Sequence, residues 1–145
     1  MAAPSPERLL VFSLAGQEFG IPLAPIVEII RHRPPTPVPG ADPVIQGILP
    51  FRGRMVTVID GRLWLGLEAR GGDQPSQVIV LRDGAELVGL LVDGAARVTS
   101  LSAGEREDLP AALRLARPDR YCGALRRENG YVVLLDLKDV LQEMS

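Results

Sequence analysis

Short apolar runs recur along the chain, and pairs of these runs flank short bends that contain glycine. Two apolar runs around such a bend are typical of a β-hairpin. The clearest bend is Asn129-Gly130, because Asn-Gly readily adopts the positive φ angles of a two-residue hairpin turn. The pattern predicts hairpins over residues 8–23, 47–60, 77–92 and 121–136.

The segments between the hairpins are less regular. Residues 24–30 fit either a short helix or a strand. Residues 31–43 contain five prolines, which cannot donate backbone hydrogen bonds, so we expect an extended loop or an edge strand there. The other segments that we expect are a helical turn at 61–66, a polar connection at 67–76, a long loop at 102–120 and a C-terminal helix at 137–144 behind an Asp136 cap.

The pattern of the first half begins again in the second half. A shift of 68 places Gly16 on Gly84 and aligns the first hairpin of each half. A shift of 76 aligns the second hairpins, and the matched pairs are Gly47 with Gly123, Leu49 with Leu125, Val56 with Val132 and Asp60 with Asp136. Because two hairpins recur in the same order, we predict a two-fold internal repeat.

Several predicted strands are apolar without alternation, namely residues 78–81, 87–92 and 131–135. A sheet with one face in water alternates apolar and polar residues, so continuous runs indicate burial on both faces. Two small barrels packed side by side would bury one face inside a barrel and the other in the seam between barrels. We therefore expect a mainly β fold of two small β-barrel subdomains around a hydrophobic seam, although composition alone also permits a sandwich.

Length and composition are those of one ordinary globular domain, with 145 residues, 46% of them hydrophobic and 23% charged. We expect a disordered leader over residues 1–7 and a single domain of two intertwined subdomains over residues 8–145. The net charge of -2 is too balanced for a surface that binds nucleic acid or membrane. Without a secretion signal or an apolar stretch near about 20 residues, we expect a cytoplasmic protein that does not insert into a membrane.

The chain offers little chemistry for catalysis or metal binding. His32 lies between arginines in the proline-rich segment and fits a surface histidine, and the single cysteine, Cys122, fits a buried reduced thiol. One histidine and one cysteine make a metal site only if carboxylates supply the remaining ligands. Asp60 and Asp136 each lie at a strand-to-helix junction, where capping explains an aspartate. We therefore expect no enzymatic activity, no cofactor and no metal site.

A series of longer motifs follows one another along the chain, in the order VFSLAGQEFGIPL, VEIIR, PTPVPGADPVIQGILPFRG, VTVID, GLLVDGAARV and YCGALRRENGYVVLLDL. The series resembles the CheW-like family over about residues 9–141. The resemblance implies two small five-stranded, SH3-like barrels flanking a hydrophobic seam, in agreement with the repeat and the two-faced strands. It also implies a non-catalytic adaptor that couples chemoreceptors to the histidine autokinase CheA in signal transduction for motility.

The resemblance implies three kinds of protein partner. The helical hairpin tip of a chemoreceptor would dock in the groove between the barrels. The regulatory domain of CheA, which has the same fold, would contact the adaptor barrel end to barrel end. Other CheW-like domains would join such contacts in rings. The adaptor would thereby associate with membrane-bound receptor arrays.

The family's Asn-Leu-Arg-Gly motif stands here as Pro50-Phe51-Arg52-Gly53, so Arg52 occupies the position of the family's characteristic arginine. Gly53 permits the positive φ of a tight turn, and the guanidinium fork of Arg52 makes directed contacts. We expect Arg52 to pair with Glu28 and to hold the hairpin beside the proline-rich segment. The partner-binding residues that we expect are Glu28, Ile29, Val38, Ile45, Gly47, Phe51, Arg52 and Gly53.

The chain departs from the family pattern at Pro50, Phe51, Thr57, Gly61 and Ala95. These departures leave open a divergent paralogue that binds the receptor and not the kinase. Two other classes are a small β-barrel nucleic-acid binder and a hydrolase that uses Asp60 or Asp136. The net charge of -2 and the aromatic content of 4% argue against the nucleic-acid binder. The sequence does not identify the receptor, the stimulus, the motility system or the oligomeric state.

Overall fold

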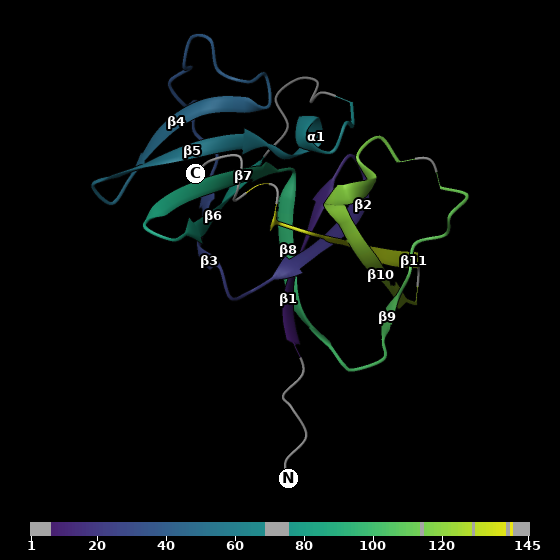
Figure 1. The fold of residues 1–145 in the computed structure, drawn as a ribbon. Helices are drawn as coiled ribbons and strands as arrows, with labels where there is room; N and C mark the ends of the chain where they lie inside the picture. Colours follow the sequence, from purple (N-terminus) through teal and green to yellow (C-terminus); the bar gives the residue numbers. More distant parts are fainter. Residues whose placement is uncertain (1–6, 69–75, 114, 129, 139, 141–145) are drawn as a thin grey trace.

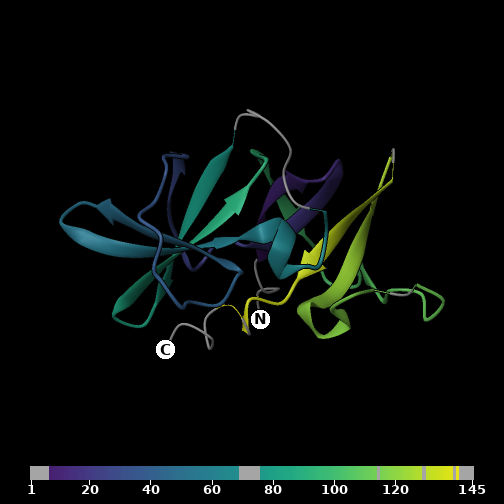
Figure 2. The same ribbon diagram turned by 90° about the horizontal axis from the view of Figure 1, so that it is seen from above.

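The computed structural model describes the chain except for residues 1–6, 69–75, 114, 129, 139 and 141–145. Most of the described chain forms strands, arranged as two sheets that lie side by side with the short helix α1 (Gly61–Trp64) between them (Figures 1 and 2). The six-stranded sheet has the order β8-β1-β2-β11-β10-β9, and the five-stranded sheet has the order β3-β6-β7-β5-β4. The fold is therefore mainly β with two subdomains, as the sequence predicts.

The strands of the first half are β1 (Glu7–Leu14), β2 (Gln17–Pro22), β3 (Ile26–Arg31), β4 (Ile45–Phe51) and β5 (Arg54–Asp60). The strands of the second half are β6 (Gln77–Asp83), β7 (Glu86–Val92), β8 (Gly94–Leu101), β9 (Arg106–Glu107), β10 (Tyr121–Arg127) and β11 (Gly130–Leu135). A short 3-10 helix, Pro118–Arg120, precedes β10.

Each sheet combines strands from both halves of the chain. In the six-stranded sheet, the β1–β2 hairpin pairs with β8 on one side and with β11 on the other. In the five-stranded sheet, the β6–β7 hairpin pairs with β3 on one side and with β5 on the other. The orders β8-β1-β2-β11-β10 and β3-β6-β7-β5-β4 match position by position. The predicted internal repeat is therefore confirmed, and its third strand and second hairpin are exchanged between the sheets.

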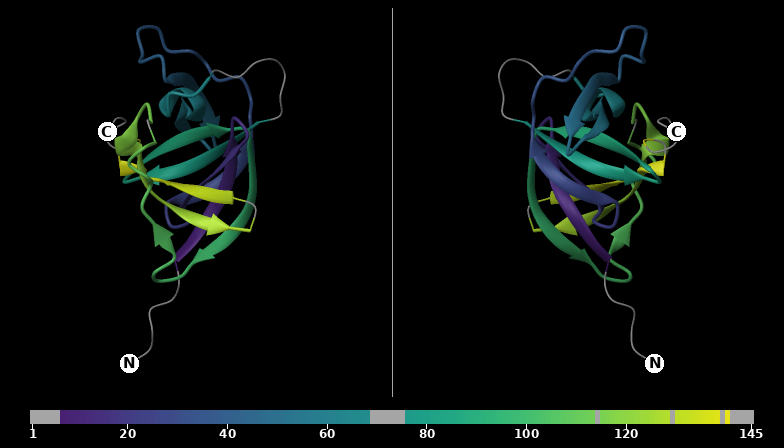
Figure 3. Two further views of the ribbon diagram at one scale, coloured as in Figure 1. Left: turned by 90° about the vertical axis from the view of Figure 1, so that its right-hand side faces the viewer. Right: turned by 90° about the vertical axis from the view of Figure 1, so that its left-hand side faces the viewer.

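The two matched hairpins share a β-bulge at the same place. The register shifts just before Gly47 in the β4–β5 pair and just before Gly123 in the β10–β11 pair. Both glycines have positive φ angles, 152° and 139°. A bulge bends its strand and increases the local twist, so the repeated bulge curls both sheets at equivalent positions. Figure 3 shows the resulting curl of the six-stranded sheet, with β1 beside β8.

The apolar side chains form three clusters, and several strands contribute to two of them. On β6, Val78 and Val80 point into the five-stranded subdomain, whereas Ile79 and Leu81 point into a central cluster, and all four residues are 0% exposed. The central cluster takes residues from both sheets and from α1, among them Phe12, Phe19, Ile59, Trp64, Ile79 and Leu90. The cluster inside the six-stranded subdomain consists of Leu9, Val11, Leu101, Leu125, Val132 and Leu134. The prediction of strands buried on both faces is confirmed for residues 78–81 and 87–92, whereas Tyr131 of the third run is 48% exposed.

The local predictions have mixed outcomes. The four hairpins and the helical turn are confirmed, and residues 26–31 form a strand rather than a helix. The loop expected at 102–120 contains the two-residue strand β9, which makes the first sheet six-stranded. The expected leader overlaps β1 at Glu7, and its other residues lie outside the described chain. Most of the expected helix at 137–144 also lies outside it, although Asp136 Oδ1 accepts a hydrogen bond from the Lys138 amide at 2.9 Å, as a cap does.

A largely buried ion pair fastens α1 to the six-stranded subdomain. Arg62 of α1 donates to both carboxylate oxygens of Asp93, at 3.1 and 2.5 Å, and the two side chains are only 13% and 15% exposed. The Ala15 amide, in the β1–β2 turn, donates to the same carboxylate at 2.8 Å. The Asp93 side chain therefore joins α1, the connection between β7 and β8, and the first hairpin.

We expect Arg62→Ala to lower the free energy of unfolding by about 3 kcal/mol, because it leaves a carboxylate in a mostly buried place without its cation. The matched control is Arg97→Ala, which breaks an ion pair with Glu18 whose side chains are 45% and 41% exposed. That loss should stay under about 1 kcal/mol. Urea unfolding of both variants measures the difference, and equal losses would contradict the role given to the Arg62–Asp93 pair.

Candidate partner-binding site

The tip of the β4–β5 hairpin carries Arg52 and Gly53, which both have positive φ angles, 51° and 75°. Positive φ at both central residues defines the type I′ turn, whose twist matches that of the flanking strands. Phe51, just before the turn, is only 8% exposed and packs in the cluster inside the five-stranded subdomain. The Arg52 guanidinium carbon lies 4.9 Å from the centre of the Phe51 ring. An aromatic residue under the tip thus supports the arginine by a cation–π contact.

Arg52 forms an ion pair with Glu28 of β3, as the sequence predicts. In the five-stranded sheet, β3 and β4 are the two edge strands. The ion pair therefore reaches from the β4–β5 turn to the opposite edge of the same sheet and helps to close the subdomain. The side chains are 67% and 37% exposed, so both charges remain available to a protein that docks on the tip.

The proline-rich segment completes this closure through its backbone. Thr36 and Ile48 of β4 exchange two backbone hydrogen bonds, with lengths of 2.8 and 2.9 Å. An Arg33 guanidinium nitrogen donates to the Pro50 carbonyl oxygen at 3.0 Å. Gly47 is required for this approach, because a Cβ atom there would lie 2.3 Å from the Thr36 carbonyl oxygen. The chain after β3 thus pairs with the free edge of β4.

The structure brings together four of the predicted site residues, which are Glu28, Phe51, Arg52 and Gly53 at the hairpin tip. Gly47 and Val38 belong to the adjoining contact with the proline-rich segment, where Val38 is 43% exposed. Ile45 begins β4 opposite Ile59. Ile29 lies apart from the tip, because it packs against the central cluster.

Three further residues, which the sequence pattern does not reveal, hold this region. Arg33 and Thr36 bind backbone atoms of β4, and Arg54 donates to the Ala85 carbonyl oxygen of the neighbouring β6–β7 turn. Their partners are main-chain atoms, which no side-chain pattern specifies. The sequence offers one signal for this contact, which is the density of prolines at residues 31–43. Prolines have no amide donor, so the segment can pair with the edge of a sheet only at a residue such as Thr36, which has one.

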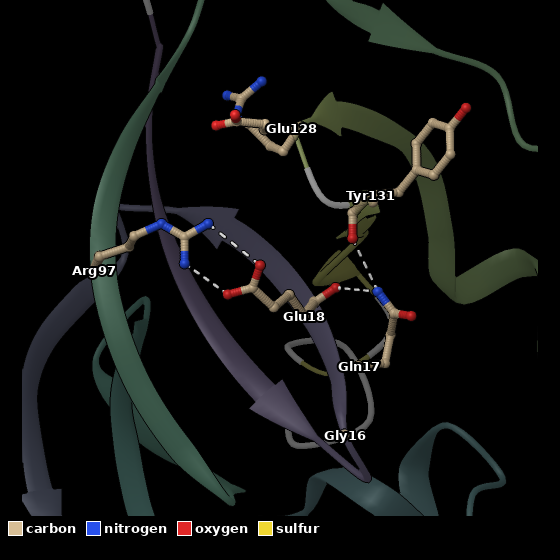
Figure 4. A pocket seen from close by; sticks show the side chains of 8 residues that line it. Gly16, Gln17, Glu18, Arg97, Glu128 and Tyr131 are labelled. Atoms are coloured by element: carbon tan, nitrogen blue, oxygen red, sulfur yellow. Dashed lines mark hydrogen bonds and ion pairs between the residues drawn. The ribbon is translucent and has the colours of Figure 1, made fainter.

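The equivalent end of the six-stranded subdomain has a charged hollow of about 530 Å³, lined by residues of the β1–β2 and β10–β11 hairpins and of β8 (Figure 4). Arg97 of β8 donates to both carboxylate oxygens of Glu18 of β2, at 2.6 and 3.3 Å. This bond holds the pKa of the Glu18 carboxyl below its ordinary value. The Gln17 amide nitrogen donates to the Tyr131 carbonyl oxygen at 3.0 Å. The hollow therefore presents charged side chains whose positions are fixed by hydrogen bonds to one another.

The acidic residues considered for catalysis are engaged by the backbone. Asp60 is the N-cap of α1 and accepts hydrogen bonds from the amides of Arg62 and Leu63, at 3.0 and 3.3 Å. The cap interpretation of Asp60 is therefore confirmed. Within the described chain, no three residues of the metal-binding types His, Cys, Asp and Glu gather into a group that could hold an ion.

The expectation that Cys122 is a buried thiol is wrong, because the residue is exposed. The residue lies at the bulge of β10, between the paired positions Tyr121 and Gly123. A bulged residue leaves the regular alternation of a strand, so the flanking apolar residues do not predict its direction. The described part of the chain contains no helix long and apolar enough to cross a bilayer.

We expect Arg52→Ala and Glu28→Ala to lower the free energy of unfolding by small amounts that are not additive. The pair is exposed, so its coupling energy should stay under about 1 kcal/mol. Urea unfolding of both single variants and of the double variant measures this coupling. Strictly additive losses would show that the two side chains do not interact in solution.

We expect Gly47→Ala to lower the free energy of unfolding by about 2 kcal/mol, because the new methyl group collides with the Thr36 carbonyl and strains the bulge. The control is Gly53→Ala, where φ is 75° and nothing lies within 4 Å of the added Cβ atom. Its cost should be the backbone term alone, about 1 kcal/mol. Unfolding curves give both losses, and hydrogen exchange at the Ile48 amide should quicken only in Gly47→Ala.

Comparison with known proteins agrees with this architecture. The Klebsiella aerogenes chemotaxis protein CheW is 28% identical over 141 residues, which are 96% of this chain and 85% of that protein. The Bacillus subtilis chemotaxis protein CheW is 28% identical over 139 residues, covering 96% of this chain and 89% of that protein. The crystal structure of the scaffolding protein TtCheW from Thermoanaerobacter tengcongensis has a TM-score of 0.80 at 24% identity, covering 91% of this chain and 90% of that chain.

The family model described as the CheW-like domain matches residues 8–145. The match extends from β1 past β11 and includes both exchanged hairpins. The chain therefore belongs to the CheW-like family.

Proposed function

We propose that the protein is a non-catalytic chemosensory adaptor that couples chemoreceptors to the histidine autokinase CheA in signal transduction for motility. The observation that carries the proposal is the CheW-like match over residues 8–145, together with an exposed arginine held at the hairpin tip by Glu28. The relatives named chemotaxis protein CheW support the same role. The adaptor would act in the cytoplasm, at membrane-bound receptor arrays.

The proposed receptor site is the surface around the β4–β5 hairpin and the proline-rich segment. Glu28, Val38, Arg52 and Gly53 would contact the receptor directly, and the more buried residues Ile29, Ile45, Gly47 and Phe51 would support them from beneath. The helical tip of a receptor would place apolar side chains between the subdomains, in the helix-in-groove mode of recognition. Val38 on the proline-rich segment and Met55 on β5 are 43% and 69% exposed and offer apolar atoms for such contacts.

The kinase contact is proposed at the ends of the subdomains. The regulatory domain of CheA has the same fold in this family, so two barrels would meet end to end, and further CheW-like domains would extend the contact into rings. Both ends present an arginine–carboxylate pair, which is Arg52–Glu28 in one subdomain and Arg97–Glu18 in the other. Interfaces of this kind are modest in area, and repeated contacts in an array supply the strength.

The departures from the family pattern bear on the alternative of a paralogue that binds only the receptor. Phe51 is buried, so its extra size is taken up inside the subdomain and not on the docking surface. Gly61 lies against the Leu91 carbonyl oxygen, where a Cβ atom would be only 2.6 Å away. Both substitutions are accommodated in the interior. This argument favours the coupling role over the paralogue.

The arrangement of charges argues against the nucleic-acid binder. Several exposed arginines have carboxylate partners, among them Arg52, Arg97, Arg106, Arg126 and Arg127. A surface that follows a phosphate backbone needs cations that are free to replace counterions. These paired arginines would have to give up their carboxylates first.

The test is co-sedimentation with membranes that carry the cognate receptors, with and without the cognate kinase. We expect the wild-type protein to pellet with the receptors and to recruit the kinase. Arg52→Ala should weaken recruitment of the kinase to the receptor membranes by about tenfold, since arginines at interface centres often contribute that much affinity. The control is Arg117→Ala, an exposed residue beside the short 3-10 helix, which should change nothing.

Three outcomes separate the parts of this proposal. A wild-type protein that pellets with neither receptor nor kinase would refute the adaptor function. Wild-type recruitment that Arg52→Ala leaves intact would refute the role of the hairpin tip alone. Pelleting with receptors that brings down no kinase would establish the paralogue alternative.

A further inference from the structure

The chain that leaves the end of β3 toward β4 contains a proline spacing that the proposed receptor and kinase contacts do not explain. Arg31, Pro34 and Pro37 are three residues apart, within the run RHRPPTP. A polyproline II helix has three residues per turn and a rise of about 3.1 Å per residue, so these side chains would share one ridge at intervals of about 9 Å. All three residues are exposed.

The neighbouring ridge faces the protein. His32 and Pro35 are half-buried, and the His32 Nε2 atom lies 3.3 Å from the Gln46 side-chain oxygen. The Pro35 Cβ atom lies 3.2 Å from where a Cβ atom at Gly47 would be. One face of the segment is therefore fastened to β4, and the ridge of Arg31, Pro34 and Pro37 is turned to solvent.

The backbone of the segment is extended and pre-ordered. Residues 32–38 contain no helical turn, proline fixes its own φ near −65°, and a residue before proline favours extended conformations. The Thr36–Ile48 hydrogen bonds and the Arg33 contact to Pro50 hold the segment at its middle. In the described chain, no backbone or side-chain donor reaches the carbonyl oxygens of Pro34 and Pro37. Among the described residues, these two acceptors have no partner of their own and could accept from a docked protein.

Two X-Pro units, Arg33-Pro34 and Thr36-Pro37, are displayed together, while Pro35 lies between them against the protein. Grooves that recognise polyproline II segments bind such units in shallow aromatic-lined pockets, and they benefit from the low entropy of the preformed helix. Arg31 adds a positive charge at one end. Within the described residues, its guanidinium has no carboxylate partner. In Figures 1 and 3 this connection projects from the five-stranded subdomain.

We propose that residues 31–37 form a docking ligand for a polyproline II-recognising partner, whose groove is lined by aromatic side chains and carries a carboxylate at the end that receives Arg31. The segment is presented by the folded protein, with its inner face held by β4. Residues 31–37 border the proposed receptor site, but their recognition by an aromatic groove does not depend on receptor or kinase binding.

The probe is an isolated SH3 domain that has an aromatic groove and an acidic specificity loop. The SH3 domain is labelled with ¹⁵N and titrated with the unlabelled full chain. The titration extends to about 1 mM, because weak specific complexes dissociate in that range. We expect saturable shift changes that are confined to the groove residues of the SH3 domain. Pro34→Ala combined with Pro37→Ala should weaken binding by about tenfold or more, because both pockets lose their occupant. Arg31→Glu should also weaken it, by placing like charges together.

The matched control is Pro43→Ala, which removes an exposed proline from the same connection outside the proposed ligand and should bind as the wild type does. Circular dichroism melting of each variant verifies that the chain is folded before the titration. Absence of groove shifts with the folded wild-type chain, or equal affinity of the double proline variant, would overturn the proposal. So would binding by a synthetic RHRPPTPVP peptide when the folded chain does not bind, because the folded chain would then hide the ligand.

Discussion

The structure depends on strands that bury both of their faces. In β6, the side chains of residues 78–81 enter two different clusters in turn, and all four are 0% exposed. Burying an aliphatic side chain stabilises a fold by about 1.5–3 kcal/mol, so a strand that does so on both faces contributes to two interiors at once. The central cluster binds the subdomains into one body, and it thereby fixes the relative placement of the two hairpin ends.

Closure of the five-stranded subdomain uses polar contacts, in contrast to its interior. Arg52, Arg33 and Thr36 connect the two edges of the sheet through an ion pair, a guanidinium–carbonyl bond and a backbone pair. Such contacts at a surface are individually weak. They order a region whose groups stay accessible, which is what a docking surface requires, since residues that are already placed lose less entropy on binding.

Local chemistry made much of the fold predictable. Some features depend only on residues that are neighbours in the sequence, so the sequence pattern predicts them. They are the Ala15-Gly16 and Arg52-Gly53 turns, the continuous apolar strands and the Asp60 cap. Strand β8 was not predicted, because it has few large apolar residues and depends on its pairing with β1. The Arg52–Glu28 pair was predicted through the family motif. The Thr36–Ile48 bridge was not predicted, because it joins main-chain atoms.

The exchange of strands between the two sheets has a consequence for biosynthesis. The β1–β2 hairpin leaves the ribosome early, but its neighbours in the sheet are β8 and β11, which are translated much later. Neither half of the chain encodes a complete sheet. The apolar β1–β2 hairpin of the nascent polypeptide therefore lacks a neighbouring strand until β11 has been translated. Such intermediates are prone to aggregate. The five-stranded sheet, in contrast, has all of its strands once β7 has been made, so the six-stranded sheet is the last part of the fold that can close.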